Sequence, residues 1–267
     1  GFSYDFLYSY EGYRYNPGMG FEMIEDFQGF RGIFGYGWFP EEKALIRYHR
    51  ISITGYNLWN TLTGQQETTY GDIDWHFEAK KGFSGNIFSA WHREDLTDTL
   101  TLGADQAYVP PGRYSFTDIA VMYNTSNSNA LSASLLADAG SFYDGWKVSF
   151  SAAPMLNIGS GFDLGLTYAL DVVNFPVRNM KFTNHIVGTR GLLTLTTKTS
   201  LSAYVQYNSA VDKVLTNVRF RYNPREGNDF YIVYDEGLNT NIIREIPALP
   251  HSSDRTILLK YTYTFRF

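Results

Sequence analysis

The chain has 267 residues, a net charge of −5 and no cysteine; 17% of its residues are aromatic and only 18% are charged. The negative charge excludes a nucleic-acid partner, which requires a basic face, and the lack of cysteine excludes disulfides and thiolate metal sites. No stretch approaches the ~18 apolar residues of a membrane-spanning helix, so the chain could cross a membrane only with strands.

Apolar and polar residues alternate along most of the chain, which predicts strands with two different faces. In chain order the clearest segments are residues 2–10, 72–80, 145–152, 161–172, 201–208, 214–223, 229–235 and 255–267. The phase breaks near residue 47, because Ile46 and Tyr48 are out of step with Ile51 and Ile53. We expect a β-bulge there.

The connections between these segments also alternate. Short ones such as 80–82 and 223–228 are rich in turn residues, while long ones such as 94–112 and 241–254 fall in the other register. This pattern is typical of an all-β, transmembrane, antiparallel up-and-down β-barrel with short periplasmic turns and longer extracellular loops. We count about 15 strands. Because single-chain barrels have even numbers, we expect 14 or 16 in one domain over residues 1–267, or a missing strand ahead of Gly1.

The apolar face is edged with Tyr, Trp and Phe, as expected where a barrel meets the membrane interfaces. The alternative is a soluble barrel or sandwich, whose strands also have one apolar face. We favour lipid because the other face has many charges in mid-strand, which a water-filled lumen would keep hydrated.

The charges expected to line the lumen divide along the sequence. An acidic wall is predicted from Asp72, Asp74, Glu78, Glu94, Asp118, Asp138, Asp163 and Asp171. A basic wall is predicted from Arg190, Lys198, Arg219, Arg221, Lys260 and Arg266. Such a division would favour polar, dipolar or zwitterionic solutes, whereas pairing of these charges would merely keep the lumen hydrated.

The chain ends in "KYTYTFRF", which resembles the recognition signal of bacterial outer-membrane β-barrel proteins. The resemblance rests on Tyr261, Tyr263, Phe265 and Phe267 at alternate positions. It implies a Gram-negative outer membrane, contact with its lipid, and insertion by the barrel-assembly machinery.

Two longer stretches carry a second resemblance. "NPGMGFEMIEDFQGFRGIFGYGWFP" (16–40) and "VRFRYNPREGNDFYIVYDEGLNT" (218–240) resemble the C-terminal barrel region of a large uncharacterised outer-membrane family. Its members typically carry a carbohydrate-binding-like domain ahead of the barrel. Residues 1–267 would then be the C-terminal part of a longer protein, and neither a ligand nor an activity can be carried over.

The predicted function is a passive pore for small polar solutes. The main alternative is a blocked barrel that anchors or scaffolds partners, either a periplasmic domain or other outer-membrane or periplasmic proteins bound through loops 94–112 and 241–254. Either long loop could also fold inward as a constriction.

A barrel-wall hydrolase is a third alternative, but we expect neither an enzyme nor a cofactor. Ser84, Ser89, Ser149 and Ser151 approach inward histidines only loosely, and no GxSxG or HExxH motif occurs. His76 and His92, with Asp74 and Glu94, are weak candidates for a metal site.

Overall fold

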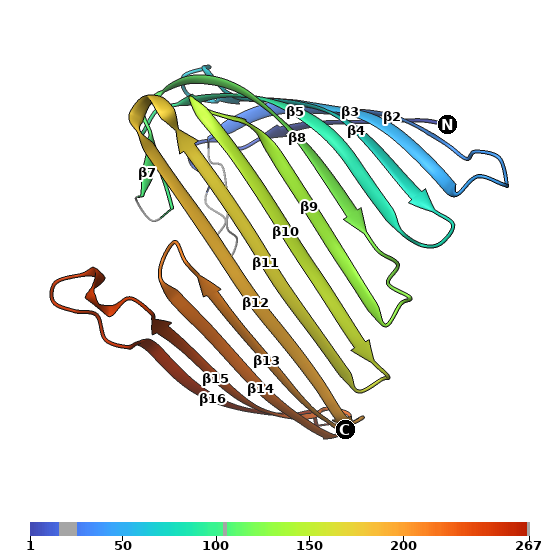
Figure 1. The fold of residues 1–267 in the computed structure, drawn as a ribbon, viewed down its shortest axis with the longest axis vertical. Coiled ribbons are helices and arrows are strands. Elements are labelled where there is room, and N and C mark those ends of the chain that lie inside the picture. The colour runs from blue at the N-terminus through green and yellow to red at the C-terminus, as the bar shows by residue number, and fades with distance from the viewer. Residues whose placement is uncertain (16–25, 104–105, 266–267) are drawn as a thin grey trace. The chain divides into compact units, whose positions relative to one another are not determined.

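The computed structural model describes residues 1–15, 26–103 and 106–265. Fourteen strands form one antiparallel sheet in chain order (Figure 1). They are β1 (Phe2–Tyr10), β2 (Phe27–Trp38), β3 (Ile46–Asn60), β4 (Gln66–Ala79), β5 (Ser84–Leu96), β8 (Gly112–Asn124), β9 (Leu131–Phe142), β10 (Gly145–Ile158), β11 (Phe162–Phe175), β12 (Met180–Thr196), β13 (Thr199–Asn208), β14 (Lys213–Arg225), β15 (Asn228–Asn239) and β16 (Ser252–Tyr263).

The remaining elements lie in connections. Strands β6 (Leu100–Leu102) and β7 (Ala107–Val109) form a separate two-stranded sheet between β5 and β8. Single 3₁₀ turns, η1 (Pro176–Arg178) and η2 (Ile242–Arg244), follow β11 and β15. No helix of the described residues is long and apolar enough to cross a membrane.

The all-β, antiparallel prediction is confirmed, and the sheet has 14 strands, one of the two even numbers expected from the count of about 15. Within the described residues the sheet is open, since β1 and β16 each have a strand partner on one side only. The chain divides into two compact units. Unit 1 comprises residues 1–124, 136–149 and 172–182, and unit 2 comprises residues 125–135, 150–171 and 183–267.

The predicted faces are confirmed by the strand register. In unit 1, Ile53 lies opposite Phe34 and Ile73 on one face, and Thr54 lies opposite Asp72 on the other. The predicted bulge is also present, because the β3–β4 register shifts between Ile46 and Tyr48. In unit 2, Phe220 is opposite both Leu201 and Ile232.

The apolar face is exposed in both units. Ile53 of unit 1 is 57% exposed, and Leu259 of unit 2 is 65% exposed. Soluble proteins rarely expose contiguous apolar patches of more than a few hundred Å².

A continuous row of aromatic rings crosses this face in unit 1. Successive ring centroids are 4.8–6.4 Å apart along Phe2, Tyr36, Trp38, His49, Trp75, Phe77, Phe83 and Tyr123. A second, shorter row joins Tyr8, Phe30 and Trp59 toward the other end of the same strands, at 4.9 and 6.3 Å. Aromatic rings therefore lie near both ends of the apolar band.

Loop lengths follow the predicted alternation only in part. The three longest connections, 11–26, 97–111 and 240–251, all join strands at the same end of the antiparallel order, and 16–25 of the first lie outside the described residues. The connection 143–144 at that end is nevertheless only a two-residue turn.

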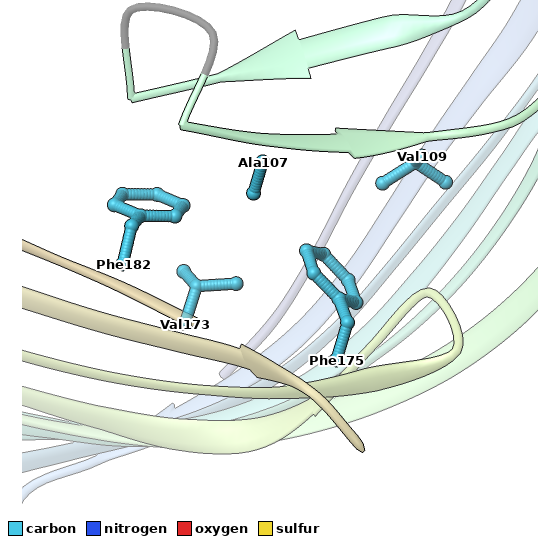
Figure 2. Packing of buried hydrophobic residues seen from close by; sticks show 5 residues of the cluster. All are labelled: Ala107, Val109, Val173, Phe175 and Phe182. Carbon is cyan, nitrogen blue, oxygen red and sulfur yellow. The ribbon is translucent and has the colours of Figure 1, made fainter. Parts of the chain in front are cut away.

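The β6–β7 hairpin packs on the face opposite the apolar one. Its Ala107 and Val109 contact Val173, Phe175 and Phe182, and all five are buried (Figure 2). In β11 the odd-numbered residues share the face of Asp171, so Phe175 belongs to the polar side. The described part of loop 94–112 therefore packs against the polar face of unit 1. That it constricts a lumen stays a prediction.

One arginine holds this hairpin. Arg178 donates hydrogen bonds to the carbonyl oxygen of Tyr108 and to the carboxylate of Asp144. Its guanidinium carbon lies 4.2 Å from the centroid of the Phe175 ring, and its side chain is only 14% exposed. The hairpin is thus attached by both apolar packing and a charged clamp.

Candidate solute-binding site on the polar face

The polar face of unit 1 contains a hollow of about 170 Å³. It lies between β5, β8, β9 and β10, and its chemically important lining residues are His92, Glu94, Phe116, Asp118, Asp138 and Lys147. The register explains part of this grouping, because His92 of β5 is directly opposite Phe116 of β8. Asp118 is two residues further along β8 and faces the same way.

The imidazole of His92 is held by three side chains. Its Nε2 is 2.8 Å from Oδ2 of Asp118, and its ring stacks on that of Phe116 at 4.8 Å with an interplanar angle of 11°. Tyr70 contacts the same imidazole edge-on at 5.1 Å. His92 is therefore a rigid part of the wall.

The turn after β9 completes the hollow. The Tyr143 hydroxyl donates a 2.6 Å hydrogen bond to Oε2 of Glu94, and its ring packs on Phe116 and Phe142 at 4.9 and 4.8 Å. Burial, reinforced by the hydrogen bond to Glu94, raises the pKa of Tyr143 above its usual value. The phenol therefore remains a neutral donor over the physiological range.

Two further features shape the site. Lys147 Nζ lies 3.6 Å from Oδ1 of Asp138 and 5.4 Å from the centroid of the Phe142 ring. A β-carbon added to Gly140 would overlap the carbonyl oxygen of Thr117, so this part of the wall has room for glycine only.

The other acidic residues predicted for unit 1 lie outside this hollow. Asp74 accepts a 2.9 Å hydrogen bond from Asn86, and Glu78 forms a 2.6 Å ion pair with Arg47. Asp72, opposite Thr54, is also on the polar face. The sequence interpretation overlooked Arg31 and Arg50, which share this face and make unit 1 less purely acidic. The alternation along the strands could have identified them, because Arg31 is out of step with Phe30 and Arg50 is in step with Thr54.

In unit 2, the register places Arg219, Arg221 and Lys260 on one polar face. Arg219 is opposite Val233, and Arg221 and Lys260 are on either side of Tyr231. Arg190 is opposite Tyr204 on the same face. Arg221 forms a 2.7 Å ion pair with Asp229.

The remaining residues predicted to line the lumen lie in different parts of the chain. Lys198 is not on a strand wall, because it lies in the two-residue turn between β12 and β13. Asp163 and Asp171 lie on the same side of β11. Arg266 lies outside the described residues. That acidic and basic sets form opposite walls of one lumen stays a prediction.

His76 and His92 do not share a site. His92 is opposite Tyr70, six residues from His76 along β4, which corresponds to roughly 20 Å. His76 instead contacts Asn86 at 3.1 Å and Glu78 at 3.5 Å. Within the part of the chain that the structure describes, no group of three or more His, Cys, Asp or Glu could hold a metal ion.

The terminal aromatic residues are exposed on one side. Tyr261, Tyr263 and Phe265 are 63%, 41% and 72% exposed, and the rings of the last two are 4.6 Å apart. Phe267 lies outside the described residues. Their role as an insertion signal stays a prediction.

In comparisons with known proteins, no protein-family model matches the chain, and no curated protein matches its sequence.

Proposed function

We propose that this chain is an outer-membrane β-barrel domain and acts as a passive pore for small polar solutes. The observation that carries the proposal is the sheet's two-sided character: an exposed apolar face with aromatic rows near both ends, and a polar face with charged side chains in mid-strand. Lipid on one face and water on the other would match both surfaces.

The dimensions agree with this proposal. His49 and Trp59, in the two aromatic rows, are ten residues apart on β3, roughly 33 Å along the strand. A strand tilt of about 40° reduces this to a height of about 25 Å, the height of the apolar band of outer-membrane barrels.

The end strands support closure of the sheet. Long unpaired strands such as β1 and β16 are prone to pair with other chains. In an antiparallel sheet of fourteen strands the first and last run in opposite directions, so pairing them would close a barrel without an exposed edge.

A blocked barrel that anchors or scaffolds partners is the second candidate, and the β6–β7 hairpin favours it. The hairpin packs on the polar side through Val109, Phe175 and Phe182, where it would narrow a lumen. The extent of this narrowing decides between a pore and an anchor.

Two measurements test the proposal in order. The refolded chain should float with phospholipid vesicles after a high-salt wash; protein left at the bottom of the gradient would overturn the membrane assignment. In a planar bilayer, inserted protein should then give discrete single-channel steps. Insertion without steps above leak would overturn the pore and support the anchor.

A matched pair of variants tests the role of the hairpin. Arg178 and Arg244 each end a 3₁₀ turn and donate a hydrogen bond to a backbone carbonyl oxygen. Arg178 bonds the carbonyl of Tyr108, and Arg244 bonds the carbonyl of Val211. Arg178→Ala should increase conductance because it releases the hairpin, while Arg244→Ala should leave it near the wild-type value. Equal effects would show that the hairpin does not limit flow.

A further inference from the structure

The hollow on the polar face of unit 1 has the chemistry of a cation site. Three carboxylates, those of Glu94, Asp118 and Asp138, face one lysine and one histidine. Its walls also include the rings of Phe116 and Phe142, and aromatic faces attract cations. The excess of carboxylates disfavours an anionic solute.

A side chain of the protein already occupies the site as an ammonium. Lys147 Nζ lies between the Asp138 carboxylate, at 3.6 Å, and the Phe142 ring, at 5.4 Å from the centroid. A carboxylate and an aromatic face are both favourable partners for a primary ammonium group. The Lys147 side chain is 35% exposed and that of Asp138 is 15% exposed, so the carboxylate is the more buried partner of the pair.

The rest of the wall is held in place independently of Lys147. His92 is bonded to Asp118, and Tyr143 is bonded to Glu94. Removal of the lysine head group would therefore leave a preformed hollow with an unpaired Asp138 carboxylate. Leaving a partly buried carboxylate without a partner is costly, so an external cation would gain from entering.

We propose that this hollow binds the primary ammonium group of a solute, and that Lys147 occupies the ammonium position when no solute is present. The proposal rests on the proposed function, because a pore would bring solutes to this face. It narrows the expected solutes from small polar molecules to those that carry an organic ammonium group.

The test uses the full chain folded in detergent micelles and n-propylammonium as the probe, with binding followed by saturation-transfer NMR at constant ionic strength. The wild type should bind weakly, because the probe competes with Lys147. Lys147→Ala should bind at least about tenfold more tightly, in line with removal of an internal competitor worth about 1.4 kcal/mol. Lys260→Ala, which removes a lysine on the polar face of unit 2, should match the wild type.

Two controls define the chemistry. Asp138→Asn should weaken binding about tenfold or more in both the wild-type and the Lys147→Ala backgrounds. Tetramethylammonium, which has no N–H donor, should compete poorly with the probe. Equal binding by Lys147→Ala and the wild type, or binding unchanged by Asp138→Asn, would overturn the proposal.

The binding test and the conductance test can fail independently of each other. Binding is measured without any conductance, so a chain that binds the probe but gives no channel steps retains the ammonium site and loses the pore. Channel steps without Asp138-dependent binding would support the pore and overturn the ammonium site. Should the Lys147 variants fail to fold, as judged by circular dichroism, the wild type and Asp138→Asn still decide the question.

Discussion

The two units of the sheet differ in what covers their polar faces. Of the ten buried apolar residues in the described chain, all except Val233 lie in unit 1. Five of them form the cluster beneath the β6–β7 hairpin. Unit 2 has a similar alternating sheet but only this one buried apolar side chain, so its strands are held mainly by backbone pairing and by contacts between neighbours on one face.

This difference shows that strand alternation alone does not make a packed interior. Unit 1 acquires one because a long connection returns over its polar side and supplies Ala107 and Val109. Under the proposed membrane assignment, unit 2 would draw more of its stability from lipid on its exposed apolar face, since burial of apolar surface is the dominant favourable term.

The largest effect should come from the interior of unit 1. Phe175→Ala should lower the free energy of unfolding by about 3–5 kcal/mol, because it leaves a cavity beneath the hairpin. Val233→Ala in unit 2 should cost about 1.5 kcal/mol, from the loss of two methyl groups. Urea unfolding of protein folded in vesicles measures both. Similar losses for the two variants would remove the contrast between the units.

An intermediate effect is expected from charges on the apolar face. Ile53→Arg in unit 1 and Leu259→Arg in unit 2 should each destabilise the vesicle-folded protein by about 2–4 kcal/mol, because in the proposed barrel each would place a cation in the hydrocarbon. Thr54→Arg, one residue along on the polar face, should cost much less. If only one of these two variants lost stability, the apolar faces of the two units would not contact the same environment.

The smallest effect concerns pH and is confined to unit 1. Burial and the bond to Glu94 raise the pKa of Tyr143 in the folded state above that of the unfolded chain, so the stabilisation is complete below about pH 10 and is lost as pH rises beyond it. Wild-type stability should therefore fall more steeply above pH 10 than that of Tyr143→Phe. Parallel pH profiles for the two proteins would contradict this assignment.

Much of the fold could be predicted because most strands have one apolar and one polar face. The alternation around Ile73 and Trp75 shows which face is apolar, and the phase break between Ile46 and Ile51 locates a bulge that the register confirms. Alternation alone gives about 15 strands; the rule that single-chain barrels have even numbers brings the expectation to 14 or 16, and the main sheet has 14.

The site itself could not be predicted, because it depends on contacts between distant segments. The Tyr143–Glu94 bond joins residues 49 positions apart, and the hairpin strands of three residues each are too short to show a period. His76 and His92 looked close because they lie on adjacent strands with like faces. The turn at 80–83 sets a register that separates them.

The even strand number has a consequence for fusion proteins. Because fourteen antiparallel strands succeed one another in chain order, the start of β1 and the end of β16 belong to the same end of the strands. If the sheet spans a membrane, reporters fused at either terminus would emerge in the same compartment. A protease added outside sealed vesicles would then cleave both reporters from any one molecule, or neither.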